Sequence, residues 1–177
     1  MIGLGIRFGV IPNYPARGDL AVACPHCKSE AVFTSPYDFL RDDAAEAACS
    51  DARITGVKWS GGFAVERFPD TFPWKDPNNP YVQVVRNEVW GVLSCGKCGH
   101  RRKHLLNWPA DAFYVIETSA GALWAYTREH LVQIRQRISG ESSGGPFDMN
   151  RLPRQFLLKR TQARLLREID AFLLRDH

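Results

Sequence analysis

Two C-x-x-C motifs, Cys24-Pro-His-Cys27 and Cys95-Gly-Lys-Cys98, restrict this chain more than any other part of its 177 residues. Each motif places two sulfurs on the same side of a tight turn, and two such turns supply the tetrahedral thiolate shell that zinc prefers. Cys49 is left over, and an odd count of cysteines argues against a disulfide framework. The spacing therefore predicts one structural Zn²⁺ ion held by Cys24, Cys27, Cys95 and Cys98.

The alternative is that the two pairs are unrelated and one of them is redox-active. A thioredoxin-like redox motif begins a helix after a strand, whereas Cys98 is followed by Gly99 and a run of bases. A glycine also suits a zinc knuckle, because the turn often needs a residue with positive φ. His26 and His100 could each replace a thiolate. With four cysteines available, we expect both imidazoles to be solvated or to lie beside the ligands.

Both motifs lie next to strand-forming segments, and two knuckles at the tips of β-hairpins define the zinc ribbon, a superfamily that this sequence resembles. The 67 residues between the motifs, 28–94, exceed the usual ribbon spacing and imply a long insertion. The stretch Leu123–Leu131 is similar to a segment that follows the second knuckle in a group of uncharacterised bacterial zinc-ribbon proteins. That resemblance covers about the second half of the chain and implies no known activity.

Strand and helix formers alternate along the chain, which predicts an α+β fold: a zinc ribbon with a long insertion, then a β-hairpin, a helix and a C-terminal amphipathic helix. We expect β-structure over 1–23, 31–34, 54–68, 81–93, 104–108 and 113–126. Residues 69–80 hold four prolines and predict an irregular loop. Helices are expected over 37–50, from an N-cap at Thr127 to about Ile138, and from Pro153 to about Leu174.

The predicted domain organisation is a zinc-ribbon domain over 1–138, with its insertion at approximately 28–94, followed by two shorter segments. Residues 139–152 form a flexible linker, because 139–146 read SGESSGGP. Residues 153–177 form the C-terminal helix, which either packs back or extends as an arm. One face of this helix carries Leu158, Leu165, Ile169 and Phe172, and the opposite face carries Arg160, Arg164 and Arg167.

Basic residues gather at two places, although the net charge is only +4. Such clusters suit phosphate contacts and make DNA or RNA the leading candidate partner. Both clusters also have simpler explanations. Four thiolates around zinc carry a net charge of −2 that nearby cations offset, and arginines commonly form the solvated face of an amphipathic helix. The candidate nucleic-acid-binding residues are Lys97, Arg101, Arg102 and Lys103 beside the second knuckle, and Arg160, Arg164 and Arg167 in the last helix.

The insertion is rich in aromatic residues, namely Trp59, Phe63, Phe68, Phe72 and Trp74. Core packing is the favoured interpretation. Aromatic residues beside prolines can also form a surface that binds a protein or stacks on bases. A protein-protein adaptor that uses this insertion or the last helix is therefore the alternative function. Cys49 has no neighbouring base, and we expect it to be a small buried residue.

The four-cysteine shell leaves no open coordination position, so the zinc is not expected to activate water. No serine-histidine-acid set or glycine-rich phosphate loop is present, and no small-molecule substrate is evident. Glu129 and His130 could suggest acid-base chemistry, but the first turn of a helix favours acids for its dipole alone. No apolar run approaches the roughly 18–20 residues that span a bilayer. The N-terminal residues show neither an early basic cluster nor a small-residue cleavage site, which predicts no signal peptide and a cytoplasmic location. We therefore expect a non-catalytic binding module that does not enter a membrane.

Overall fold

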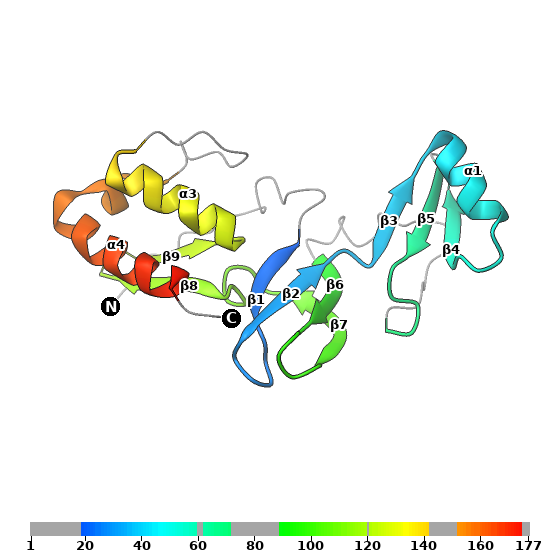
Figure 1. Ribbon diagram of the computed structural model, residues 1–177, viewed down its shortest axis with the longest axis horizontal. Helices are drawn as coiled ribbons and strands as arrows, with labels where there is room; N and C mark the ends of the chain where they lie inside the picture. The colour runs from blue at the N-terminus through cyan, green and yellow to red at the C-terminus, as the bar shows by residue number, and fades with distance from the viewer. Residues whose placement is uncertain (1–18, 60–61, 72–88, 120, 142–151, 175–177) are drawn as a thin grey trace, which may run out of the picture. The chain divides into compact units, whose positions relative to one another are not determined.

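The computed structural model describes residues 19–59, 62–71, 89–119, 121–141 and 152–174, and it confirms the α+β class (Figure 1). The predictions for 1–18 and for most of the proline-rich loop and the strand at 81–93 lie outside these ranges. The described residues fall into two compact units. The first is drawn from Thr34–Val92 and Arg102–Trp108, and the second from Asp19–Phe33, Leu93–Arg101 and Pro109–His177.

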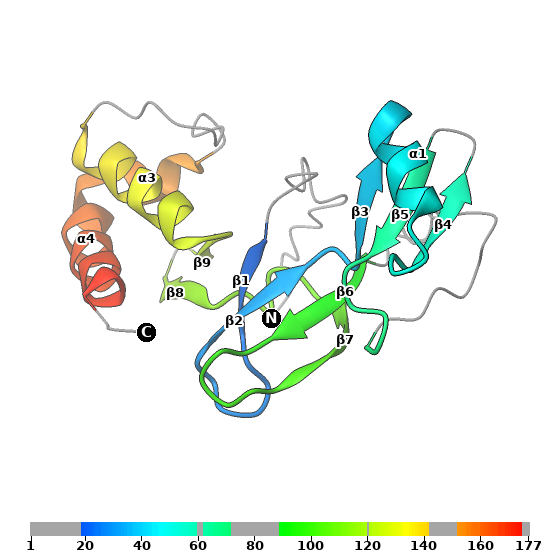
Figure 2. The same ribbon diagram turned by 45° about the vertical axis from the view of Figure 1, so that its right-hand side comes forward.

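Four strands form a sheet in the order β1-β2-β6-β7, and each C-x-x-C turn joins two of them. Their bounds are Leu20–Ala23 for β1, Glu30–Thr34 for β2, Val89–Ser94 for β6 and Arg101–Leu106 for β7. β1 and β2 are antiparallel, with Leu20 opposite Phe33. β7 begins three residues before the strand predicted over 104–108. Since β2 and β6 are neighbours in the sheet, the turns that precede β2 and follow β6 come together (Figure 2).

The insertion forms a three-stranded antiparallel sheet in the order β3-β5-β4, with one helix against β5. Its elements are β3 (Tyr37–Leu40), α1 (Asp42–Ser50), β4 (Gly56–Trp59) and β5 (Gly62–Glu66), and the hairpin predicted over 54–68 is confirmed. The helix predicted over 37–50 is wrong in its first part. Tyr37 pairs with Glu66 and Leu40 with Phe63, and this pairing overrides the helical composition. The strand ends at Leu40, and the chain changes direction at Asp42, the first residue of α1, where φ is +52°.

Small hydrophobic clusters hold the first unit together. Ala45 and Ala48 of α1 pack with Phe63, and Phe68 packs against a cluster that contains Tyr37. Phe63 therefore belongs to the core and Phe68 packs against it, in agreement with the favoured interpretation of the aromatic insertion. The Trp59 side chain, Phe72 and Trp74 lie outside the described residues. Cys49 is exposed, so the prediction that it is buried is wrong: α1 turns Ala45 and Ala48 inward instead.

The second unit contains the predicted hairpin and two helices. Its elements are β8 (Tyr114–Thr118), β9 (Gly121–Ala125), α3 (Arg128–Ser139), the 3₁₀ helix η2 (Arg154–Leu157) and α4 (Lys159–Leu173). The Thr127 hydroxyl accepts from the His130 N–H at 3.2 Å, which confirms the predicted N-cap. The last helix begins later than predicted. Because Leu158 is extended, it separates η2 from α4, which begins at Lys159.

α3 and α4 pack together and against the β8–β9 hairpin (Figures 1 and 2). Ile134 of α3, Leu165 and Ile169 of α4, and Ile116 of β8 are at most 2% exposed and belong to one core. An ion pair of 2.6 Å between Arg135 Nε and Asp170 Oδ1 also joins the helices. The C-terminal helix is therefore packed rather than free. Within the described ranges, no helix combines the length and the apolar character that a membrane crossing needs.

Candidate metal centre

The same pattern of backbone hydrogen bonds closes both C-x-x-C turns. In the first turn, the Lys28 N–H donates to the Cys24 carbonyl, and the Cys24 N–H donates to the Ser29 carbonyl, both at 2.9 Å. In the second, the Gly99 N–H donates to the Cys95 carbonyl at 3.0 Å, and the Cys95 N–H donates at 2.8 Å to the carbonyl five residues later. The two turns therefore share one local fold, although their sequences match only at the cysteines.

The residue after each motif has a left-handed backbone, with φ of +62° at Lys28 and +72° at Gly99. This confirms the positive φ expected at Gly99. A Cβ atom at Gly99 would meet no heavy atom within 4 Å, so a substitution there is opposed by backbone strain and not by a steric clash. Lys28 adopts the same conformation without the freedom of glycine. The first turn therefore carries strain that the second avoids.

The four sulfurs of the two turns form one compact cluster. The Sγ atoms of Cys24 and Cys98 are 3.8 Å apart, those of Cys27 and Cys95 are 3.6 Å apart, and all four lie within 4.8 Å of one another. A disulfide needs a sulfur-sulfur distance of about 2.0 Å, so all four are free thiols. A tetrahedral ion with bonds of about 2.3 Å to sulfur separates its ligands by roughly 3.8 Å. The cluster therefore fits a four-coordinate metal ion.

The surroundings of the sulfurs shift the pKa values of the Cys27 and Cys98 thiols in opposite directions. The backbone N–H of Ser29, followed by its hydroxyl, lowers the pKa of the Cys27 thiol to about 6. At Cys98 the His100 backbone N–H also lowers the pKa, but desolvation and the neighbouring thiols outweigh it and raise the pKa to about 12. Four adjacent thiols cannot all ionise without a cation among them. The cluster thus has the chemistry of a metal site that takes up its ion with loss of protons.

The cluster lies within the second unit, and two of its cysteines are buried there. Cys24 is fully buried, and Cys95 is nearly so. The Cys95 Sγ lies 3.8 Å from the Glu30 carbonyl oxygen, while the Glu30 carboxylate accepts from the Tyr114 hydroxyl at 3.0 Å. This hydrogen bond connects the strand after the first turn to the β8–β9 hairpin. Tyr114 and Glu30 were not predicted as part of the site, because a short motif does not show contacts 84 residues apart. Ser29 was not predicted either, because its contact with Cys27 depends on the folded turn.

His26 and His100 are not members of the cluster. The His26 ring is exposed, the His100 ring is half-buried, and the two rings stack with centroids 6.0 Å apart and planes 15° apart. The expectation that they are solvated or lie beside the ligands therefore agrees with the structure.

The four candidate bases of the second knuckle have different environments. Lys97 lies exposed in the turn, and Arg101 and Arg102 are exposed at the start of β7. Lys103 is half-buried, and its Nζ lies 4.6 Å from the centroid of the Trp90 ring. Successive side chains of a strand point to opposite faces, so Arg101 and Arg102 do not share a face of β7. These bases consequently do not form a single patch on one face of the strand.

Arg160, Arg164 and Arg167 are all exposed on α4, as the amphipathic pattern predicted. On the opposite face, Leu165 and Ile169 are fully buried, whereas Leu158 is 43% exposed because it precedes the helix. Arg164 pairs with Glu168 at 2.6 Å and donates to the Glu117 carbonyl at 3.2 Å. The Arg164 guanidinium therefore makes intramolecular contacts to α4 and to the β8–β9 hairpin.

Glu129 and His130 make contacts at the start of α3. His130 is 7% exposed, its Nδ1 accepts from the Tyr126 N–H at 3.1 Å, and its ring stacks on the Tyr126 ring at 5.1 Å. Burial lowers the pKa of His130 to about 4. Hydrogen bonds from its own backbone N–H and from Thr127 lower the pKa of the Glu129 carboxyl, as expected in the first turn of a helix. His130 is therefore a neutral imidazole that fastens the start of α3.

Comparison of the chain with protein-family models, with curated proteins and with solved structures finds no match. The site can therefore be interpreted only from its own geometry.

Proposed function

We propose that this chain is a non-catalytic binding module built around one structural zinc ion held by Cys24, Cys27, Cys95 and Cys98. The observation that carries the proposal is the spacing of the four sulfurs, 3.6 and 3.8 Å across the two turns. An all-sulfur tetrahedral donor set is the shell that structural zinc prefers. Bound zinc would neutralise two of the four thiolate charges and hold the two turns together. With no coordination position open, it would not present water to a substrate.

Cobalt(II) substitution tests the donor set. The chain loaded with Co²⁺ should show the thiolate charge-transfer and visible ligand-field bands of a tetrahedral all-sulfur site. Cys98→Ser should change both sets of bands, since it removes one ligand. Cys49→Ser is the matched control, because Cys49 is exposed and lies outside the cluster, and it should leave the spectrum unchanged. A six-coordinate spectrum of the wild-type chain would contradict the proposed site.

A nucleic acid is the proposed partner of the module. The exposed bases Lys97, Arg101 and Arg102 support this, since they lie in or just after the second turn, and Arg160 and Arg167 of α4 are exposed as well. Phosphate contacts of this kind are independent of sequence and release counterions. Within the described residues, Phe63, Phe68 and the apolar face of α4 are used for internal packing, which leaves the protein-adaptor alternative with less support.

Salt-dependent binding of single-stranded and duplex oligonucleotides tests this partner. Affinity should fall steeply with salt, and replacement of Lys97, Arg101 and Arg102 by Gln should weaken binding and reduce the slope of log K against log salt by about 2–3. The matched control replaces three exposed bases elsewhere, Arg41, Lys58 and Arg137, by Gln. Equal weakening by both triple variants, or no salt-dependent binding at all, would refute the proposal and favour a protein partner.

A further inference from the structure

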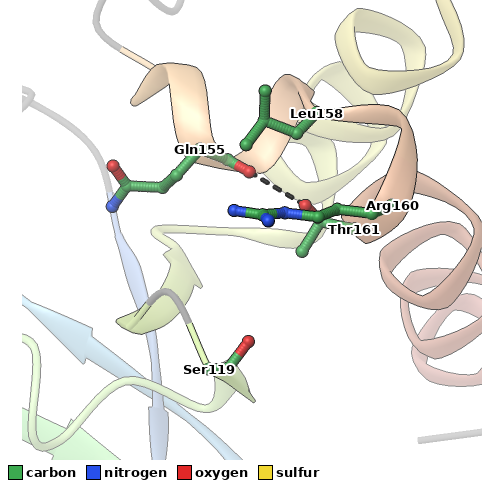
Figure 3. Close-up of a pocket in the computed structure, with 5 residues that line it drawn as sticks. All are labelled: Ser119, Gln155, Leu158, Arg160 and Thr161. Carbon is green, nitrogen blue, oxygen red and sulfur yellow. Dashed lines mark hydrogen bonds between the residues drawn. The ribbon is translucent and has the colours of Figure 1, made fainter.

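A pocket of about 250 Å³ opens in the second unit, away from the cysteine cluster in sequence (Figure 3). Its lining comes from the turn that follows β8, the 3₁₀ helix η2, the extended link at Leu158 and the first turn of α4. Its described lining residues are Ser119, Gln155, Leu158, Arg160 and Thr161. None of these residues is acidic, and the Arg160 guanidinium and the Ser119 hydroxyl lie on facing sides of the space (Figure 3).

Arg160 is the only charged member of this described lining. Its guanidinium extends from α4 toward Gln155, and the Ser119 hydroxyl points toward it from the hairpin (Figure 3). Within the part of the chain that the structure describes, no hydrogen bond or ion pair engages this guanidinium. Arg164, one turn later on the same helix, is in contrast bound by Glu168 and the Glu117 carbonyl. Arg160 thus offers an uncompensated positive charge to the pocket.

The remaining groups favour an acceptor-rich ligand. The Ser119 hydroxyl can donate a hydrogen bond into the space. The Thr161 hydroxyl already donates to the Gln155 carbonyl at 3.0 Å, which fixes the chain where η2 meets α4. Leu158, at 43% exposure, adds one apolar wall. A planar guanidinium with a neighbouring hydroxyl donor suits the oxygens of a phosphoryl group.

We propose that this pocket binds a phosphoryl group, with Arg160 as the main electrostatic contact and the Ser119 hydroxyl as a neutral donor. The volume exceeds that of a phosphate group alone and falls below the roughly 300 Å³ at which drug-sized ligand pockets begin. A small phosphate ester or a terminal phosphate therefore suits it better than a large cofactor. The pocket stands on its own geometry and does not require that the second knuckle binds nucleic acid.

The test is a titration of the ¹⁵N-labelled, zinc-loaded full chain with inorganic phosphate at constant ionic strength, followed by NMR. The amides of Ser119, Arg160 and Thr161 should shift with one saturable curve. Arg160→Gln should raise the apparent Kd at least about tenfold, which corresponds to about 1.4 kcal/mol. Arg160→Lys should retain part of the affinity. Shifts that never saturate, or that match those caused by added chloride, would overturn the proposal.

The matched control is Arg137→Gln, which removes one exposed charge from the end of α3, outside the described lining. It should leave the phosphate Kd unchanged, and an effect equal to that of Arg160→Gln would overturn the proposal. Further arms compare adenosine monophosphate with adenosine, and a 5′-phosphorylated oligonucleotide with its unphosphorylated form. The phosphorylated ligand of either pair should bind more tightly and so identify the source of the group. If adenosine alone shifted the same amides as strongly as its phosphate, the pocket would not recognise phosphate.

Discussion

Lys28 and Gly99 occupy the same position in the two turns, one residue after the second cysteine of each motif. Both have left-handed backbones, and both donate to the carbonyl of the first cysteine of their motif. A left-handed conformation costs a non-glycine residue roughly 1–2 kcal/mol. The geometry of the sulfurs therefore depends on a residue that is not itself a ligand.

Gly99→Ala should weaken metal binding by about 1–2 kcal/mol, because the new Cβ strains the left-handed backbone without meeting a clash. Competition with a chromophoric zinc chelator measures this change. Gly96→Ala is the control, since a Cβ at Gly96 also meets nothing within 4 Å and no positive φ is found there. A loss no larger for Gly99→Ala than for Gly96→Ala would show that the left-handed position does not matter for the site.

His130 should make the second unit less stable in mild acid. Its pKa is about 4 in the folded chain, where burial disfavours the charged ring, and about 6.5 when unfolded. Between these values the unfolded chain binds more protons, so the free energy of unfolding falls as the pH falls from 6.5 to 4. The loss amounts to about 3 kcal/mol.

The measurement for this prediction is urea denaturation of the wild type and of His130→Asn across that range. The variant keeps an acceptor for the Tyr126 N–H but cannot titrate there. It should be less stable than the wild type at pH 7, and the difference should shrink toward pH 4. A difference that stays constant with pH would contradict a neutral, buried His130.

At the scale of elements, the local signals in the sequence predicted most of the described structure. The second hairpin and the N-cap at Thr127 rest on short-range patterns and are present, and the described end of the β-run before the second motif forms β6. The wrong predictions concern residues whose structure depends on contacts with residues far away in the sequence. Residues 37–40 form a strand because β5 pairs with them. The burial of Cys49 was predicted wrongly because the sequence does not show which face of α1 packs inward. Leu158 belongs to an extended link and not to the apolar face of α4.

The apolar face of α4 should provide much of the stability of the second unit. Leu165 is fully buried in the core shared by α3, α4 and the hairpin. Leu165→Ala should therefore lower the free energy of unfolding by about 2–5 kcal/mol. Leu158→Ala, at a position 43% exposed, should cost less than about 1 kcal/mol. Chemical denaturation monitored by circular dichroism distinguishes the two, and equal losses would mean that α4 does not pack as described.

At the scale of the whole molecule, the metal site joins parts of the chain that are far apart in sequence. Cys27 and Cys95 are separated by 68 positions, and the insertion with its own sheet and clusters lies between them. Structural zinc contributes about 10–16 kcal/mol to small zinc domains, comparable to the 5–15 kcal/mol that stabilises a typical domain. The spacing of the four cysteines was sufficient to predict that they come together as one site. It could not show Ser29 and Glu30 as their neighbours, because those contacts depend on the folded turns and sheet.

Cys95→Ser should consequently leave the chain aggregated or without a cooperative melting transition. It removes one of the four thiols, so the remaining three cannot complete a tetrahedral shell around the metal ion. Calorimetry of the variant beside Cys49→Ser measures this, and the control should melt like the wild type. A soluble Cys95→Ser chain with the wild-type melting temperature would show that the site does not stabilise the fold.

The metal content of the purified chain tests the central claim most directly. Plasma mass spectrometry of protein prepared without added metal should find one zinc ion per chain in the wild type and in Cys49→Ser, and far less than one in any Cys95→Ser protein that can be recovered. Wild-type chain that is folded, fully reduced and free of zinc, and that takes up none when zinc is supplied, would contradict the account.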